Sequence, residues 1–154
     1  MLLACGWHCV SGVSLRAQSS WIVVTPAGTP ARIEFDTTSL RAVPGGVVGR
    51  FRWTGNLPTA AVGGAPVATM QRDAIADCVS GKVALEGVRY LDAAGGVLDG
   101  TTWDETEWEF VAPPGRSYAA IERDALCRVA NAKHLGAERR PPTSPARPPH
   151  NGGW

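Results

Sequence analysis

Residues 113–129 read PPGRSYAAIERDALCRV, and the spacing of apolar side chains changes within them. The Pro-Pro-Gly run at their start predicts a turn. Ser117 is suited to cap a helix, because its hydroxyl can accept a hydrogen bond from a free backbone N–H. Apolar side chains then recur at helical spacing, at Tyr118, Ile121, Ala125 and Val129. The stretch predicts a helix of about three turns over Ser117–Val129.

Upstream of this helix, apolar and polar side chains alternate, which is typical of strands. The alternation is clearest at Val47–Trp53, where Arg50 and Arg52 oppose Phe51 and Trp53. Short turns separate most of these runs, and a longer Gly, Ala and Pro-rich loop is expected at Thr54–Pro66. We expect strands at Trp21–Thr25, Ala31–Phe35, Val47–Trp53, Val67–Cys78, Val83–Leu91 and, as one interrupted strand, Val97–Leu98 with Trp103–Val111. Their order predicts an antiparallel meander and an α+β fold.

Cys127 conflicts with the simplest form of this helix. At about 100° per residue, it lies nearly opposite the apolar stripe. Either the last turn is irregular, or Cys127 reaches the sheet from the end of the helix. Leu126 and Ala119 flank Cys127 on the helix surface, so a wider buried arc is a further alternative.

Length and charge restrict the class of protein. The chain has 154 residues, with 15 Lys and Arg against 14 Asp and Glu, and 44% of its residues are hydrophobic. One core-forming domain with tails fits this length. A net charge of +1 argues against a nucleic-acid binder held by bulk charge. No apolar run reaches the roughly 18 residues that a spanning helix needs.

The two ends differ from the middle. Residues 1–20 are apolar and then small and polar, which resembles part of an export signal, and Leu2–Cys5 resembles a lipobox that would make Cys5 a candidate for lipidation. Residues 132–154 are rich in Pro and Arg and predict a disordered tail. The folded domain is therefore expected over residues 21–131.

The four cysteines are Cys5, Cys9, Cys78 and Cys127, which allow three sets of two disulfides. None belongs to a CxxC pair, and a structural zinc site is not expected. If the leader is removed, Cys78 and Cys127 remain as one pair. That bond would close a loop of about 50 residues and stabilise the fold by on the order of 4 kcal/mol.

Several stretches, in order, resemble the surface-adhesin protein E-like family of small exported proteins of Gram-negative bacteria. They are Phe35–Arg41 (FDTTSLR), Val47–Trp53, Asp77–Cys78, Tyr90–Gly95, Trp108–Pro113 and Ser117–Cys127, and they span about Trp21–Val129. The resemblance implies a curved six-stranded antiparallel sheet with the C-terminal helix on its concave face. It also implies that Cys78 and Cys127 join the helix to the sheet. The chain departs from the family at Glu122, where a larger apolar residue is common, and in the 54–66 loop.

A catalytic set is not expected. The histidines His8, His134 and His150 lie outside the predicted domain, so a histidine-dependent nucleophile or metal site lacks its ligand or base. We expect no metal, no cofactor and no enzymatic activity. The alternative is the acidic run, in which Glu105, Glu107 and Glu109 share one strand face, where they could bind a cation or simply remain solvated.

A binding surface is the remaining expectation. Its candidate residues are Trp103, Glu105, Glu107, Glu109, Arg50 and Arg52. Trp21, Trp53 and Trp108 are expected in the core. The sequence favours an exported binding protein of the periplasm, outer membrane or cell surface. Its partner would be a protein, with a small ligand or assembly partner as the alternative, and any membrane contact would come through a lipid anchor.

Overall fold

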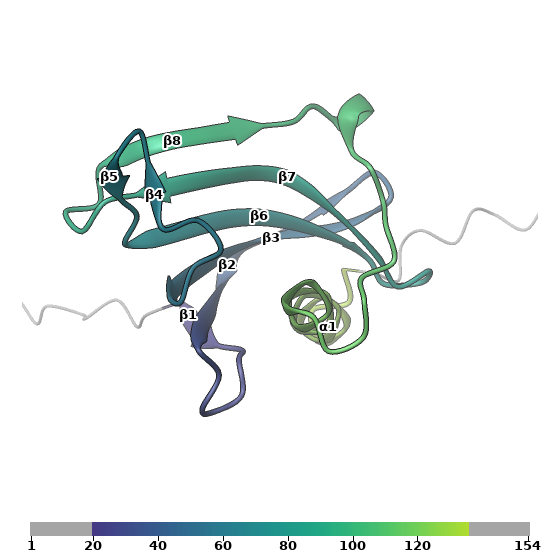
Figure 1. Ribbon diagram of the computed structural model, residues 1–154. Helices are drawn as coiled ribbons and strands as arrows, with labels where there is room; N and C mark the ends of the chain where they lie inside the picture. The colour runs from purple at the N-terminus through teal and green to yellow at the C-terminus, as the bar shows by residue number, and fades with distance from the viewer. Residues whose placement is uncertain (1–19, 136–154) are drawn as a thin grey trace, which may run out of the picture.

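A computed structural model describes residues 20–135 and confirms the α+β fold, as Figure 1 shows. One antiparallel sheet has six strands in the order β1-β2-β3-β6-β7-β8. Their bounds are β1 Trp21–Val23, β2 Ala31–Val43, β3 Gly46–Gly55, β6 Thr69–Asp77, β7 Lys82–Leu91 and β8 Val97–Thr102. The sheet curves around a single helix, α1 Tyr118–Ala132, which lies on its concave side.

The 54–66 region, expected to be a loop, contains a small hairpin. Strands β4 Ala61–Val62 and β5 Ala65–Pro66 pair with each other, outside the main sheet. The turn between them is Gly63-Gly64, with φ of 56° and 85°. These angles lie in the left-handed region, where glycine carries no Cβ penalty, so the two glycines allow the tight turn.

Strand β2 extends eight residues beyond the predicted Phe35 because a bulge lets it continue. The register with β3 shifts between Asp36 and Arg41. Within the bulge, Thr38 donates its backbone N–H and its hydroxyl to Asp36 Oδ1, at 3.0 and 2.7 Å. Ser39 Oγ accepts from Arg50 N at 2.7 Å and so bridges to β3. Polar side chains therefore replace the missing ladder hydrogen bonds.

The expected strand at Trp103–Val111 is wrong. Strand β8 ends at Thr102, and a short 3₁₀ turn, η1 Glu105–Glu107, follows. This connecting segment stays against the edge of β7 through two contacts. Trp103 N donates to Glu86 O at 2.8 Å, and Val111 forms an isolated antiparallel bridge with Val83. Between these two points the backbone is irregular, although its side chains still alternate in direction.

The main core lies between the sheet and α1. Phe35 and Phe51 are paired across β2 and β3, and their rings stack with centroids 5.0 Å apart. Gly49 makes close packing of the helix on β3 feasible. A Cβ atom at Gly49 would lie 2.6 Å from both Leu126 Cδ2 and Phe35 Cε2, so any side chain there would push the helix outward.

The helix begins as predicted but buries a different arc. Ser117 Oγ accepts a hydrogen bond from Ala120 N at 3.2 Å, which confirms the N-cap. The fully buried positions are Ala120, Glu122, Ala125, Leu126 and Ala130. Ile121 is only partly buried. The arc is wider than the predicted stripe and displaced toward Cys127, which settles the conflict noted above.

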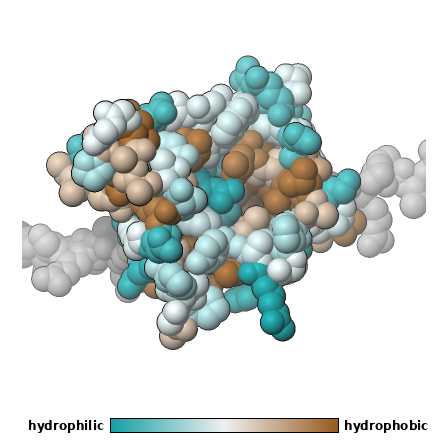
Figure 2. Space-filling view, viewed as in Figure 1, coloured by the Kyte–Doolittle hydropathy of each residue, from teal (hydrophilic) through white to brown (hydrophobic). Residues whose placement is uncertain are grey.

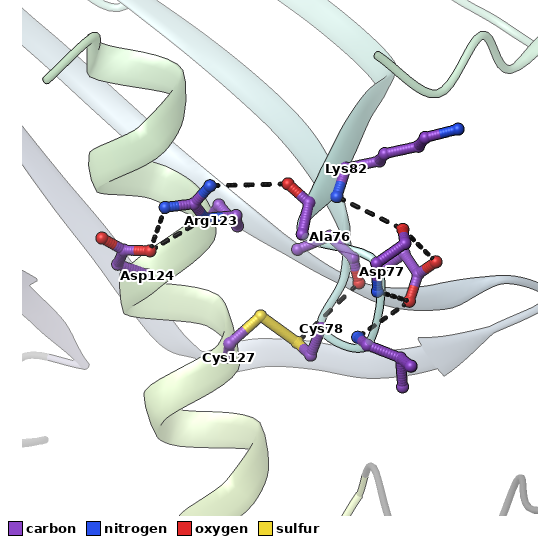
Figure 3. The surroundings of a disulfide bond; sticks show 10 residues. Ala76, Asp77, Cys78, Lys82, Arg123, Asp124 and Cys127 are labelled. Atoms are coloured by element: carbon purple, nitrogen blue, oxygen red, sulfur yellow. Dashed lines mark hydrogen bonds and ion pairs between the residues drawn. A yellow bond between two sulfur atoms is a disulfide. The ribbon is translucent and has the colours of Figure 1, made fainter. Parts of the chain in front are cut away.

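The Cys78–Cys127 disulfide joins α1 to the turn between β6 and β7, as Figure 3 shows. The side chain of Asp77 holds this turn, since its Oδ1 accepts from Val79 N at 2.9 Å and Ser80 N at 3.2 Å. A hydrogen bond from the Ser80 hydroxyl lowers the pKa of Asp77, which keeps the carboxylate charged. The turn is therefore fixed independently of the sulfur bridge that it carries.

The convex face of the sheet carries paired charges and a small apolar cluster. Arg50 donates to both carboxylate oxygens of Asp73, at 2.7 and 3.0 Å, and Arg89 donates to Asp73 at 3.2 Å. Arg52 contacts Glu34 and stacks on Trp21, with Cζ 4.4 Å from the ring centroid. The cluster contains Val43, Val48, Ile75 and Ala84, and Trp108 and Phe110 pack against it.

The predicted core tryptophans fall into two groups. Trp53 is buried in the main core, at 3% exposure. Trp21 and Trp108 are half-buried on the convex side. Trp103, a candidate of the predicted binding surface, is also half-buried.

Candidate functional site

A pocket of about 400 Å³ lies between the N-terminal half of α1, strands β6 and β7, and the segment that follows β8. Its walls are mostly apolar, formed by Ala74, Val83, Ala84, Leu85, Val111, Ala119 and Leu126, with the Trp103 side chain beside them. Its charged members are Arg72, Glu107, Glu109, Glu122 and Arg123. Figure 2 shows hydrophilic and hydrophobic residues side by side on the face of the molecule that it draws.

A buried ion pair contributes to the inner wall. The Glu122 side chain is 2% exposed, and its Oε2 lies 3.5 Å from Arg72 Nη1. Its other oxygen, Oε1, accepts a hydrogen bond from Trp53 Nε1 at 2.7 Å. Burial raises the pKa of Glu122 above its usual 4.5, against the opposing effects of the Arg72 charge and the Trp53 hydrogen bond. The polar end of this carboxyl group is thus satisfied inside an apolar surrounding.

Arg72 lies beside this carboxyl group, and some of its N–H donors are not used in hydrogen bonds. Its side chain is 18% exposed, and its Cζ lies 5.2 Å from the centroid of the Trp53 ring. Beyond the ion pair with Glu122, the guanidinium group of Arg72 donates no hydrogen bond to another group within residues 20–135. A guanidinium group carries five N–H donors. Arg72 can therefore donate to a polar atom that enters the pocket.

The opposite wall comes from the segment between β8 and α1. Its alternating side chains place Glu107, Glu109 and Val111 toward the pocket and Trp108 and Phe110 toward the convex cluster. Glu107 also closes the η1 turn, because its Oε2 accepts from Asp104 N at 2.7 Å. Both carboxylates are exposed. They therefore lie at the mouth of the pocket, in water, whereas Glu122 lies in its interior.

The structure brings together part of the predicted binding surface. Trp103, Glu107 and Glu109 line the pocket, and Glu105 is exposed in η1 but is not among the lining residues. The prediction that the three glutamates share a strand face is wrong, because η1 breaks the alternation at Glu105. Arg50 and Arg52 lie on the convex face, paired with Asp73 and Glu34. They pair with carboxylates of β6 and β2, rather than with the acidic run.

Sequence reasoning missed three charged residues of the pocket, Arg72, Glu122 and Arg123. Arg123 extends from α1 toward the disulfide-bearing turn, where its Nη1 lies 3.5 Å from Gly81 O, and its Nη2 lies 2.7 Å from Asp124 Oδ1. A signal for Glu122 was present, because it stands four residues from both Tyr118 and Leu126. A stripe centred on those positions would have put a carboxyl group in the core.

The pocket offers binding groups of two kinds. Its lining contains guanidinium and carboxyl groups but no serine, cysteine, lysine or histidine. His134 is the single histidine in the described chain and is exposed in the turn after α1. Within residues 20–135, no three metal-ligating side chains gather. Charge and apolar contact are therefore the means by which this pocket can select a ligand.

Comparison with known proteins gives no relative. No family model, curated protein or solved structure matches the chain. No helix between residues 20 and 135 has the length and apolar character to cross a membrane. The predicted leader except Ser20, the lipidation candidate Cys5 and all but the first residues of the predicted tail lie outside the described residues.

Proposed function

We propose that this chain is an exported, non-catalytic binding protein of the periplasm, outer membrane or cell surface of a Gram-negative bacterium. In this proposal it binds a protein partner through the pocket between α1 and the sheet. The observation that carries it is the Cys78–Cys127 bond, which fastens α1 beside the pocket it helps to form. A disulfide persists in an oxidising compartment and is rare in the cytosol.

The disulfide also bears on how the pocket binds. Arg123 and Glu122 line the pocket, and Cys127 follows them by one helical turn. Because the disulfide holds α1 at Cys127, the pocket side chains of the helix are in position before a ligand binds. Preorganisation of this kind reduces the entropy cost of binding. It favours a binding module whose site exists before the partner arrives.

The sequence resemblance to surface-adhesin protein E supports the same class. Binding of a host matrix or plasma protein follows from that resemblance if the bacterium is a pathogen. The pocket supports one alternative, a periplasmic or lipid-anchored envelope protein that binds a small ligand or an assembly partner. Its volume of about 400 Å³ lies within the range of small-molecule sites.

Intact-mass measurement without reduction, on protein from fractions of the native host cell, tests export. A shortened chain that lacks two hydrogens, recovered outside the cytosol, is expected. A full-length chain with free thiols in the cytosol would overturn the proposal. Protease treatment of intact cells then separates the locations, since digestion indicates surface display and protection indicates the periplasm.

A further inference from the structure

The charges that line the pocket do not balance. Arg72 is paired with Glu122, at 3.5 Å, and Arg123 is paired with Asp124, at 2.7 Å. Glu107 and Glu109 form no ion pair with any residue of the described chain. The mouth of the pocket is therefore negative, while each cation of its lining already has a carboxyl group beside it.

The negative surface continues beyond the mouth. Asp104 and Glu105 precede the two pocket glutamates, are exposed, and form no ion pair within residues 20–135. Four carboxylates thus follow one short exposed segment. A small cation would meet only the pair at the mouth, whereas a longer ligand could contact the whole segment. The extent of the charge favours a polypeptide over a small molecule.

Apolar surface lies directly inside this acidic mouth. Val111 is 50% exposed, and Trp103 is half-buried with its side chain in the pocket lining. Leu85 and Val83 of β7 continue the same surface inward. Burying such surface stabilises a complex by roughly 25 cal/mol per Å² before the costs of binding are subtracted. A large apolar side chain is the group that this interior selects.

We propose that the pocket binds a basic segment of a partner protein that carries one large apolar side chain. The apolar side chain enters between Trp103 and Leu85. Lysine or arginine side chains on either side of it pair with Glu107 and Glu109. A backbone carbonyl of the segment accepts from the unused donors of Arg72. This inference rests on the proposed function and specifies the chemistry of its partner.

Three capped peptides test the two halves of this recognition, each titrated into the oxidised, ¹⁵N-labelled full chain. The first has the sequence Lys-Leu-Phe-Leu-Lys, the second Glu-Leu-Phe-Leu-Glu, and the third Lys-Ser-Gly-Ser-Lys. The first is expected to shift the indole N–H resonance of Trp103 and to bind at least about tenfold more tightly than the others. Equal binding of the second or third peptide would overturn the proposal, as would failure of the first to perturb Trp103.

Two matched variants locate the charge contact. Glu109→Gln removes one carboxylate at the mouth and is expected to lower the affinity for the first peptide about three- to fivefold. Glu105→Gln makes the same change in the same exposed segment but outside the pocket lining. It is expected to change affinity less than about twofold. Equal losses in both variants would show that general negative charge, rather than the pocket, attracts the peptide.

A pair of helix variants locates the apolar contact. Ala119→Phe fills the pocket from α1, and Ala132→Phe adds the same side chain at the exposed end of that helix. We expect the first to reduce peptide affinity at least about fivefold and the second to leave it unchanged. Phenethylammonium is the small-cation control. If it binds as tightly as the peptide, the pocket takes a small ligand and the segment proposal fails.

Failure here and failure of the proposed function give different results. If the protein is exported and oxidised but binds none of the three peptides, the proposed function stands and the proposal of a basic, apolar partner segment fails. If the protein is found reduced in the cytosol, the proposed function fails, whether or not the peptides bind.

Discussion

The two faces of the sheet come from the same alternating strands but handle charge differently. On the convex face, Arg50, Arg89 and Asp73 form one set of ion pairs, partly exposed to water. On the concave face, the buried Glu122 shares its carboxyl group between Arg72 and the indole of Trp53. The convex charges neutralise one another in a solvated layer. The concave carboxyl group lies inside the core beside a pocket.

The two faces show that exposed and buried charged residues contribute to the fold in different ways. Exposed ion pairs contribute little free energy, typically below about 1 kcal/mol each, and they keep a sheet face soluble. A buried carboxyl group loses hydration and is retained only with partners. The concave face is thus the more sensitive to substitution. The pocket mouth differs from both, because its carboxylates are exposed and have no ion-pair partner in the described chain.

The largest expected effect comes from releasing α1 from the concave face. The double variant Cys78→Ala/Cys127→Ala removes a bond between residues 49 apart in sequence. Loss of this loop constraint is expected to lower the free energy of unfolding by about 4 kcal/mol. Urea denaturation followed by circular dichroism measures it. A reducing agent should destabilise the wild type similarly and leave the variant unchanged; an effect below about 1 kcal/mol would contradict the role given to the bond.

A smaller effect is expected from one added methyl group on each face. Gly49→Ala places a Cβ 2.6 Å from Leu126 Cδ2 on the concave side and should cost about 1–3 kcal/mol through overpacking. Gly87→Ala is the matched change on the convex side, where the nearest atom is Thr101 O at 3.3 Å. It should cost less than about 1 kcal/mol. Equal midpoints of thermal unfolding for the two variants would refute the difference between the faces.

The two faces should also respond oppositely to pH. The raised pKa of Glu122 means that the folded state binds its proton more tightly, so this group's contribution is present below its usual 4.5 and declines as pH rises above that value. At Glu34, partial burial alone would raise the pKa, but hydrogen bonds from Arg32 and Arg52 outweigh it and lower the pKa. Its contribution is present above 4.5 and is lost as pH falls below that value and through the lower pKa of the folded state.

Unfolding free energies measured across acidic and neutral pH test both signs. Glu122→Gln should flatten the decline on the alkaline side of 4.5, while its amide oxygen still accepts from Trp53. Glu34→Gln should flatten the loss on the acidic side. If both substitutions altered the pH dependence of the unfolding free energy in the same direction, the two carboxyl groups would not lie in opposite environments.

The smallest effect is expected on the convex face itself. Asp73→Asn removes the charge shared by Arg50 and Arg89, whose side chains are 38% and 41% exposed. The cost should stay below about 1 kcal/mol and shrink as salt is added, because solvent screens such pairs. A loss above about 2 kcal/mol that salt does not change would show that these pairs act as a buried network.

Much of the fold was predictable, because local signals and long-range contacts agree. Turn residues separate strands whose alternation matches the sheet, and the Ser117 cap marks the start of α1. The strand prediction for residues 103–111 failed because alternation indicates which side a residue faces, not whether its backbone pairs with a neighbouring strand. Trp108 and Phe110 pack against the convex cluster, yet after Trp103 only Val111 hydrogen-bonds to the backbone of β7.

The candidate site was predictable only in its acidic half. Trp103, Glu107 and Glu109 stand close together in sequence, so composition alone drew attention to them. Arg72 and Glu122 are 50 residues apart and meet only when α1 packs on β6. Their pairing depends on the rotation of the helix, which a short apolar stripe specifies weakly. The cationic candidates Arg50 and Arg52 share a strand face that their own cross-strand carboxylates neutralise.

The meander order of the sheet also has a consequence for the sequence of events during synthesis. Each strand of the main sheet pairs with the strand before it, apart from the small hairpin between β3 and β6, so every ladder closes a short loop. Short-range closure is fast, and the complete sheet precedes α1 in the chain. Cys78 is therefore expected to be held in its turn before Cys127 leaves the ribosome. Timed alkylation of nascent chains would reveal this order, with Cys78 held in a folded turn before Cys127 is available to complete the bond.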